Sequence, residues 1–241
     1  MVFVAGALLR VTNLGAGVVT FAGGSGVTVT NTAASLSQFQ TATLVRTGSD
    51  AWTVIRQGAD APGMDLITPT SVAGSGVTVS GGKVSFTGAT EVSVNGCFTS
   101  AYDNYMLMCD LTAASASNSD ITARLRLSGT NATTNYAGVR TYSNGGAVNT
   151  LTTGTYNAFF MTSADTSIPT IPSFSAKLFR PAIAVATTSL VEALQSSSGS
   201  AVFQNLMSMY HSTATAYDGI SIISGSGNIA GTLRIYGLRN S

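Results

Sequence analysis

Residues 121–127 have the sequence Ile121-Thr122-Ala123-Arg124-Leu125-Arg126-Leu127, and residues 231–238 have the sequence Gly231-Thr232-Leu233-Arg234-Ile235-Tyr236-Gly237-Leu238. Apolar and polar side chains alternate in both stretches, which is the pattern of a β-strand with one buried face. Asn144-Gly145-Gly146 stands between two further apolar stretches, as in a tight β-hairpin. Short strands separated by turns predict an all-β fold, and residues 89–241 are expected to form an antiparallel, jelly-roll-like β-sandwich.

The first third of the chain contains shorter strand signals. Gly24-Ser25-Gly26-Val27-Thr28-Val29-Thr30 recurs with one change as residues 74–80, and each copy predicts a glycine turn followed by a short strand. Residues 41–55, between the two copies, predict a hairpin whose turn is Gly48-Ser49-Asp50. Residues 21–88 are therefore expected to form a stack of small hairpins, which bury little surface alone and need other chains to complete a core.

Three local features refine this organisation. Trp52 is the only tryptophan, and we expect it to anchor either the core or the trimer interface of the hairpin region. Residues 57–69 combine glycine and proline and are the best linker candidate in the first half. Residues 189–195 form the one segment with a helical pattern, and it is short.

The composition argues for self-association and against nucleic acid as a partner. Charged residues make up 9% of the chain, compared with about 25% in an ordinary soluble domain. The net charge is +1, and the only lysines, Lys83 and Lys177, belong to no basic run that could neutralise phosphates. A surface so poor in charge, on a chain of mean hydropathy +0.31, fits a protein that is largely covered by copies of itself.

Cysteine usage and the N-terminus suggest an intracellular, cytosolic origin. Cys97 and Cys109 are too few for a disulfide scaffold and are expected to be buried free thiols, with a single bridge as the alternative. Residues 1–9 are apolar, but they lack a preceding basic region and are much shorter than the about 20 residues of a membrane helix. We therefore expect residues 1–20 to be an attachment segment that binds another protein and does not insert into a membrane.

Several stretches resemble proteins of bacteriophage particles. Residues 36–40, 43–48 and 51–54 (Leu-Ser-Gln-Phe-Gln, Thr-Leu-Val-Arg-Thr-Gly and Ala-Trp-Thr-Val) resemble a hairpin module of phage tail-fibre and related virion proteins, which packs in a trimeric shaft. Residues 98–105, 125–130, 135–136 and 231–237 resemble the opening and closing strands of a phage virion domain. The resemblance implies a virion structural protein of the tail-fibre, spike or head-fibre kind, and related modules also occur in baseplate and collar proteins.

Catalytic and metal-binding patterns are weak in this sequence. His211 is the only histidine, Asp218 is the nearest acid that could complete a triad with it, and no G-x-S-x-G motif supplies a nucleophile. Asp103, Asp110 and Asp120 are candidate carboxylates for polysaccharide cleavage, although each also fits a turn or a strand end. One histidine and two separated cysteines cannot form a four-ligand zinc site. We expect a protein that is not an enzyme and that uses no metal or cofactor.

Carbohydrate binding is the one ligand class that the sequence leaves open. Sugar sites combine aromatic faces with amides and hydroxyl groups, and several such residues lie in or near the predicted hairpin at Asn144. They are Tyr136, Arg140, Tyr142 and Tyr156. The alternative is that these side chains pack within the sheet or a subunit interface.

The function expected from the sequence is a homotrimeric tail fibre or spike of a virion, attached to another virion protein by residues 1–20. Its outward-facing sandwich, residues 89–241, would contact host cell-surface polysaccharide. A capsid-decoration, head-fibre, baseplate or collar protein without a receptor role is the first alternative, and a polysaccharide depolymerase is the second.

Overall fold

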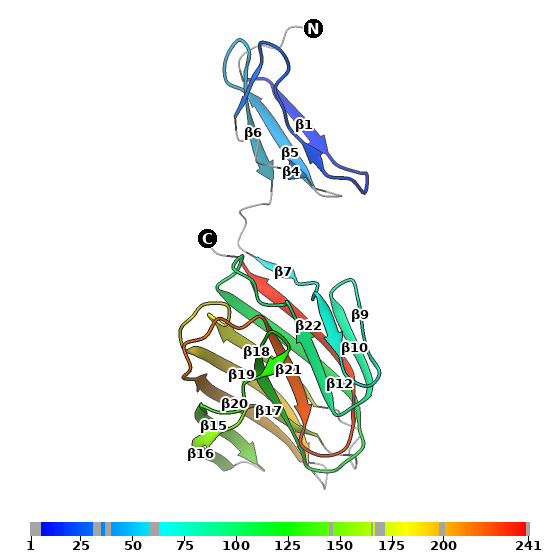
Figure 1. Cartoon of the computed structure of the whole chain (residues 1–241), viewed down its shortest axis with the longest axis vertical. Helices are drawn as coiled ribbons and strands as arrows, with labels where there is room; N and C mark the ends of the chain where they lie inside the picture. Colours follow the sequence, from blue (N-terminus) through cyan, green and yellow to red (C-terminus); the bar gives the residue numbers. More distant parts are fainter. Residues whose placement is uncertain are drawn as a thin grey trace. The chain divides into compact units, whose positions relative to one another are not determined.

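The structure is a computed structural model. It describes residues 6–30, 35–36, 40–57, 63–144, 147–164, 166, 172–197 and 201–239. Every regular element in these ranges is a β-strand, which confirms the all-β fold predicted from the sequence, and none of them is a helix that could cross a membrane. The chain divides into two compact units, Met1–Ala61 with Ser241 and Pro62–Asn240. We call them the N-terminal unit and the C-terminal unit (Figure 1).

The N-terminal unit is built around a four-stranded sheet. Its strand order is β1 (Leu8–Thr12), β5 (Thr41–Arg46), β6 (Ala51–Gln57) and β3 (Thr28–Thr30), and β2 (Val19–Thr20) pairs separately with β4 (Ser35–Leu36). The hairpin β5–β6 is the one that the sequence predicts at residues 41–55, while β3 runs parallel to β6. Residues 1–20 were expected to be a separate attachment segment, but they supply β1 and β2 to these sheets.

The core of the N-terminal unit is small. Leu36, Ala42 and Val54 are its fully buried apolar side chains among the described residues. Trp52 lies two residues before Val54 on β6, so both point to the same face of the sheet, and Trp52 is half-buried there. Trp52 therefore lies on the core side of the sheet, and its role in a trimer interface stays a prediction.

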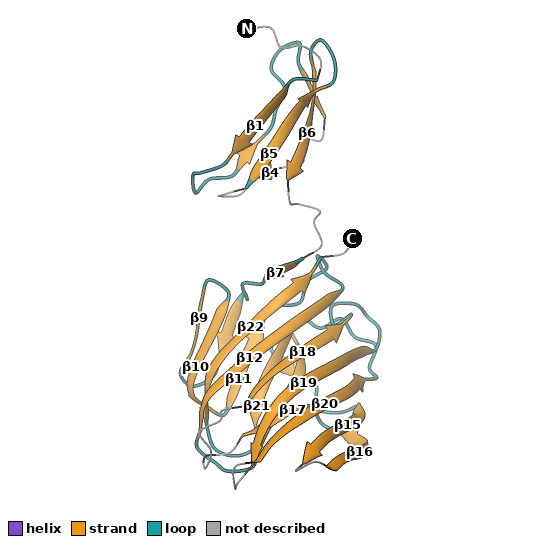
Figure 2. Ribbon diagram, turned by 180° about the vertical axis from the view of Figure 1, so that it is seen from behind, coloured by secondary structure: helices purple, strands orange, loops and turns teal. Residues whose placement is uncertain are grey.

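The C-terminal unit contains two antiparallel sheets (Figures 1 and 2). The large sheet has ten strands, in the order β16 (Ala147–Tyr156), β15 (Tyr136–Asn144), β20 (Ala201–His211), β19 (Thr187–Ser197), β18 (Ser173–Phe179), β12 (Asn104–Ala114), β22 (Ile229–Leu238), β10 (Lys83–Ala89) and β9 (Val77–Ser80), with β7 (Met64–Leu66) also paired to β22. The small sheet has the order β14 (Thr130–Asn131), β13 (Ser119–Leu127), β21 (Gly219–Ser224), β11 (Glu91–Asn95) and β8 (Ser71–Ala73), with β17 (Phe159–Ala164) also paired to β13.

One hydrophobic core fills the space between these two sheets. The alternating residues of β13, Ile121, Ala123 and Leu125, are fully buried, and Leu233 and Ile235 of β22 face them from the large sheet. The antiparallel sandwich predicted from these strands is therefore confirmed, as is the β15–β16 hairpin that pairs Asn144 with Ala147. In β12 and β22 burial alternates along the strand, so the outer face of the large sheet is available for function.

Both cysteines are free and buried, as the sequence predicted. Cys97 is 0% and Cys109 1% exposed. Burial raises the pKa of both thiols, because the apolar core disfavours the thiolate. Since the thiolate is the reactive form, both side chains act as core residues.

The structure moves the boundary between the two parts of the chain. The sequence placed it after residue 88, but it lies between Ala61 and Pro62, inside the linker candidate at residues 57–69. The reason is long-range pairing. Strand β10 is hydrogen-bonded to β22, and β8 to β11, so residues 64–88 belong to the sandwich. The two copies of the glycine repeat consequently lie in different units.

Residues 189–195 were expected to be helical, and this prediction was wrong. They belong to β19, which pairs along its length with β18 and β20. Val191 and Ala193 are buried and alternate with exposed Glu192 and Leu194, as in a strand with one buried face. Pairing with a strand on each side therefore outweighs the local helix propensity.

Candidate functional site

Two surface hollows of the C-terminal unit contain polar side chains in arrangements suited to binding. The first, which we call the Arg140 hollow, lies at the β15 side of the large sheet and has a volume of about 130 Å³. Its lining includes Asp120, Arg140, Tyr156, Phe160 and Met207. These residues come from five different strands, so the hollow exists only in the folded sandwich.

Arg140 is held firmly at this hollow. The register of β15 with β20 pairs Arg140 with Met207 and Tyr142 with Asn205, so the side chains of all four point to the same side of the sheet. Arg140 Nε donates a hydrogen bond of 2.7 Å to Asn205 Oδ1. The guanidinium carbon lies 4.8 Å from the ring centre of Tyr142 and 4.5 Å from that of Phe160. The cation is therefore placed between two aromatic faces.

Asp120 supplies the opposite charge. Its Oδ1 accepts a hydrogen bond of 2.7 Å from Ser163 Oγ, across the pairing of β13 with β17. Burial lowers the pKa of Arg140, whereas the nearby Asp120 carboxylate works in the opposite direction. A carboxylate, a guanidinium and the rings of Tyr156 and Phe160 can together bind a ligand that has hydroxyl groups and an apolar face.

The structure brings together three of the four residues proposed for glycan contact. Arg140 and Tyr156 line the Arg140 hollow, and Tyr142 contacts the guanidinium of Arg140. Tyr136 does not belong to this group, because it is 0% exposed. Sequence reasoning missed Phe160, for which no local signal exists, since its strand reaches the hollow only through the packing of the two sheets.

Tyr136 instead belongs to an aromatic cluster in the core. Its hydroxyl accepts a hydrogen bond of 3.0 Å from Leu125 N and donates one of 3.2 Å to Ala132 O. Its ring lies 4.8 Å from that of Phe159 and 4.4 Å from that of His211, centre to centre. His211 Nε2 is 2.5 Å from the hydroxyl of Tyr217. The only histidine is thus a packed core residue.

His211 should make the stability of the C-terminal unit fall between pH 7 and about pH 5. Burial lowers the pKa of His211 from 6.5, although the backbone at Thr134 and Asn135 opposes the shift. Below pH 6.5 the unfolded chain therefore binds a proton that the folded chain does not, which favours unfolding with a slope of at most about 1.4 kcal/mol per pH unit. Urea unfolding at pH 7.5 and pH 5.0 would measure this loss.

The variant His211→Asn is the control for this pH dependence. It lacks the titrating group, so its stability should change little over the same interval. The lowered pKa values of Asp65 and Glu91 affect stability only at lower pH, because the ordinary pKa values of these groups are 3.8 and 4.5. An equal loss of stability in the variant and the wild type would contradict the prediction.

The candidate catalytic acids do not converge. The carboxylate of Asp218 accepts hydrogen bonds from the backbone N of Ser128, while the histidine that could use it in a triad pairs with Tyr217. Asp120 lies in the Arg140 hollow and Asp110 in a different one, and Asp103 precedes β12. Within the described ranges, no three His, Cys, Asp or Glu side chains could jointly hold a metal ion.

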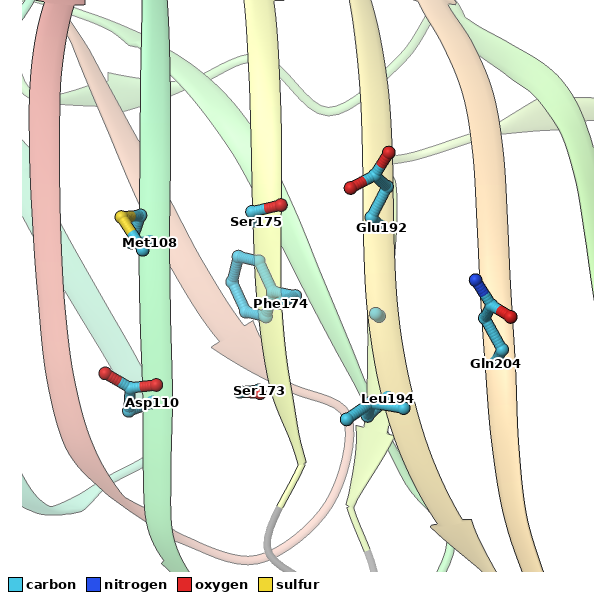
Figure 3. Close-up of a pocket in the computed structure, with 9 residues that line it drawn as sticks. Met108, Asp110, Ser173, Phe174, Ser175, Glu192, Leu194 and Gln204 are labelled. Atoms are coloured by element: carbon cyan, nitrogen blue, oxygen red, sulfur yellow. The ribbon is translucent and has the colours of Figure 1, made fainter. Parts of the chain in front are cut away.

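The second hollow, which we call the outer hollow, opens on the outer face of the large sheet (Figure 3). It has a volume of about 280 Å³, and the small side chains of Ser173 and Ser175 on β18 form its floor. Met108 and Asp110 of β12 border one side, and Glu192 and Leu194 of β19 border the other.

The two acids of the outer hollow are far apart. Asp110 pairs with Ser173 and Glu192 with Ser175, so they lie two strands apart and two residues out of register. Strand geometry then separates their Cα atoms by about 12 Å. The carboxyl groups of a retaining glycosidase are about 5 Å apart, so this arrangement does not resemble such a pair.

Comparison with known proteins adds no relative. No protein family, curated protein or solved structure matches this chain. The fold by itself defines the class, a two-unit all-β protein with an antiparallel sandwich.

Proposed function

We propose that this chain is a structural component of a bacteriophage particle, a homotrimeric tail fibre or spike that projects from the virion. The observation that carries the proposal is the unfinished core of the N-terminal unit. Among the described residues of this unit, the fully buried apolar side chains are Leu36, Ala42 and Val54, a small number for a unit of this size. A domain of about 60 residues buries only about 60% of the surface that its unfolded chain exposes and is marginally stable by itself, so contacts with other copies would stabilise this unit.

The open face of the N-terminal sheet offers the surface that copies of the chain would share. Cross-strand pairing aligns Leu8 with Val45, and Arg10 with Thr43 and Ile55. Leu8 is 68% and Ile55 51% exposed. Three copies that pack these faces around one axis would bury these apolar side chains and add a second apolar layer on the side of the sheet opposite Ala42 and Val54, in agreement with the low charge of the chain.

The turn after β1 supports attachment of this unit to another virion protein. Asn13 Nδ2 donates to Gly17 O and Leu36 O, and its Oδ1 accepts from Gly15 N. This network fixes the turn while Leu14 is 73% and Val18 63% exposed. A fixed turn that displays two apolar side chains is suited to a protein partner. Leu14 and Val18 lie within residues 1–20, the segment predicted from the sequence to attach to another protein.

The Arg140 hollow supports a receptor role for the C-terminal unit. Sugars present hydroxyl groups to carboxylates and guanidinium groups and apolar faces to aromatic rings, and Asp120, Arg140, Tyr156 and Phe160 supply these groups. This feature favours a fibre or spike that contacts host-surface polysaccharide over a decoration, baseplate or collar protein without a receptor role.

Ile55→Asp should dissociate the trimer, because a carboxylate at the centre of the proposed interface would be desolvated. Sedimentation velocity of the full chain would show loss of the three-fold species. Leu14→Asp is the matched control: it should leave the trimer intact and reduce incorporation into particles, where electron microscopy would also locate the protein. A wild-type chain that is a folded monomer at micromolar concentration would overturn the proposal.

A further inference from the structure

The outer face of the large sheet is an extensive surface that the small sheet does not cover. Figure 2 shows its central strands β22, β12, β18, β19 and β20 side by side. Apolar side chains are exposed along it, among them Met108 at 44%, Leu194 at 49% and Leu206 at 46%. Apolar side chains that are exposed together on one face are typical of an interaction site.

One row of this face has opposite charges at its two ends, while Asp110 and Lys177 lie in the rows on either side of it. Strand register aligns Glu192 with Ser175, Ser175 with Met108, and Met108 with Arg234. The row therefore has an acid at its β19 end and a base at its β22 end, with the floor of the outer hollow and a methionine between them. Among the described residues, neither Glu192 nor Arg234 forms an ion pair within the chain.

This row is complementary to itself. A two-fold axis parallel to the strands, between β18 and β12, places β19 of one copy over β22 of the other. Glu192 then meets Arg234 twice, and Met108 of each copy meets Ser175 of the other, where the outer hollow provides about 280 Å³. Such a contact uses the same patch on both copies, as two-fold interfaces require.

The area is sufficient for a specific contact. The axis between β18 and β12 also places β20 of one copy over β10 of the other, so the contact has six strands. Six strands at about 4.8 Å spacing, with four outward residues each at about 6.8 Å, cover about 780 Å² on each copy. Two copies together would bury about 1,600 Å², within the range of about 1,200–2,000 Å² for specific protein interfaces.

We propose that the C-terminal units of two copies of this chain pair face to face through the outer face of the large sheet, with Glu192 of each opposite Arg234 of the other. The pairing goes beyond the proposed trimer and does not depend on it. If the N-terminal units form trimers, the pairing connects trimers to one another, and the smallest closed assembly with both kinds of axis has six chains.

Charge reversal tests the pairing in the full chain. Arg234→Glu should weaken the two-fold contact at least about tenfold by placing like charges opposite each other, and so convert six-chain species into three-chain species. The double variant Glu192→Arg/Arg234→Glu restores opposite charges and should restore six chains. Arg124→Glu, on the outer face of the opposite sheet, is the matched control and should change nothing.

The same measurements separate failure of this inference from failure of the trimer. Ile55→Asp should leave pairs of chains, and Ile55→Asp combined with Arg234→Glu should leave single chains. Pairs without trimers would refute only the proposed function. Trimers whose size is unaffected by Arg234→Glu would refute only the pairing.

Thiol labelling gives a second measurement that does not depend on assembly size. Because Cys97 and Cys109 are buried, a maleimide should react selectively with a cysteine introduced at the surface. Ser175→Cys should be labelled at least about tenfold more slowly than Thr122→Cys on the opposite sheet, and adding Arg234→Glu should abolish the difference. Equal labelling rates without the charge reversal would overturn the proposal.

Discussion

Replacing Tyr136 with alanine should lower the free energy of unfolding of the C-terminal unit by about 3–5 kcal/mol, the usual loss for a large buried aromatic side chain. The ring is fully buried and contacts Phe159 and His211, so the substitution leaves a cavity between the two sheets. Tyr136→Phe keeps the ring and removes only the hydroxyl that bonds to Leu125 N and Ala132 O. This substitution should lower the free energy of unfolding by about 1–3 kcal/mol, because the backbone groups of Leu125 and Ala132 lose their hydrogen-bond partner.

The control for Tyr136 is a tyrosine of the same strand that lies at the surface. Tyr142 is half-buried beside Arg140, and Tyr142→Ala should change stability by less than about 1 kcal/mol while it reduces adsorption to host cells. Urea unfolding followed by circular dichroism is the appropriate measurement, since the only tryptophan, Trp52, lies in the N-terminal unit. A small stability loss for Tyr136→Ala, together with an adsorption defect, would mean that Tyr136 is a ligand contact after all.

The contrast between these two tyrosines shows what the sequence could predict. Alternation along residues 121–127 and 231–238 identified strands and their buried faces, because side-chain direction in a strand depends only on local geometry. Tyr136, Arg140 and Tyr142 share one face of β15 by the same rule. Their depth differs because Phe159 and His211 pack against Tyr136, whereas Tyr142 lies beside the guanidinium of Arg140, and only the folded arrangement determines this.

The domain boundary illustrates the same limit. Residues 74–80 repeat residues 24–30 almost unchanged, and both segments contain short strands, so the local prediction was sound. Their partners differ. β3 pairs with β6 in the N-terminal unit, whereas β9 joins the large sheet through β10, which pairs with β22 near the end of the chain. Pairing across such a separation leaves no signal in either segment alone.

The candidate site was only partly visible in the sequence for a related reason. Arg140 and Tyr142 lie two residues apart and could be grouped by inspection. Asp120, Phe160 and Asn205 reach the same place from three other strands. Each of these residues fits an ordinary strand position, and their shared surroundings arise from the packing of the two sheets.

Arg126→Ala should destabilise the C-terminal unit by about 3–5 kcal/mol, the range for breaking a buried ion pair by removing one partner. The Arg126 side chain is 8% exposed and forms an ion pair of 3.3 Å with Glu91. Its guanidinium also donates to four other described residues: Asn95, Gly129, Asn131 and Ser221. These bonds fasten the turn between β13 and β14, where Ser128 and Gly129 have positive φ angles of 50° and 81°. Losing the guanidinium leaves buried Ser221 and half-buried Glu91, Asn95 and Asn131 without this donor.

Glu91→Ala should lower the free energy of unfolding by less, about 2–3 kcal/mol. The Glu91 side chain is 38% exposed, so water replaces part of its hydrogen bonding to the network. Burial raises the pKa of Glu91, but hydrogen bonds from Asn131, Ser221 and Ser93 together with Arg126 outweigh it and lower the pKa overall. The contribution of Glu91 to stability should therefore be present at neutral pH and disappear as the pH falls below about 4.5.

The ion pair between Asp65 and Arg239 is the matched comparison for the pair of Arg126 and Glu91. Its N–O distance is shorter, 2.5 Å, but its side chains are 32% and 30% exposed. Surface ion pairs contribute about 0–1 kcal/mol, so Arg239→Ala should have a small effect despite the better distance. Urea unfolding of the three alanine variants at pH 7 would test the expected order, with Arg126 largest and Arg239 smallest. If Arg239→Ala cost as much as Arg126→Ala, burial would not be what gives the Arg126 network its strength.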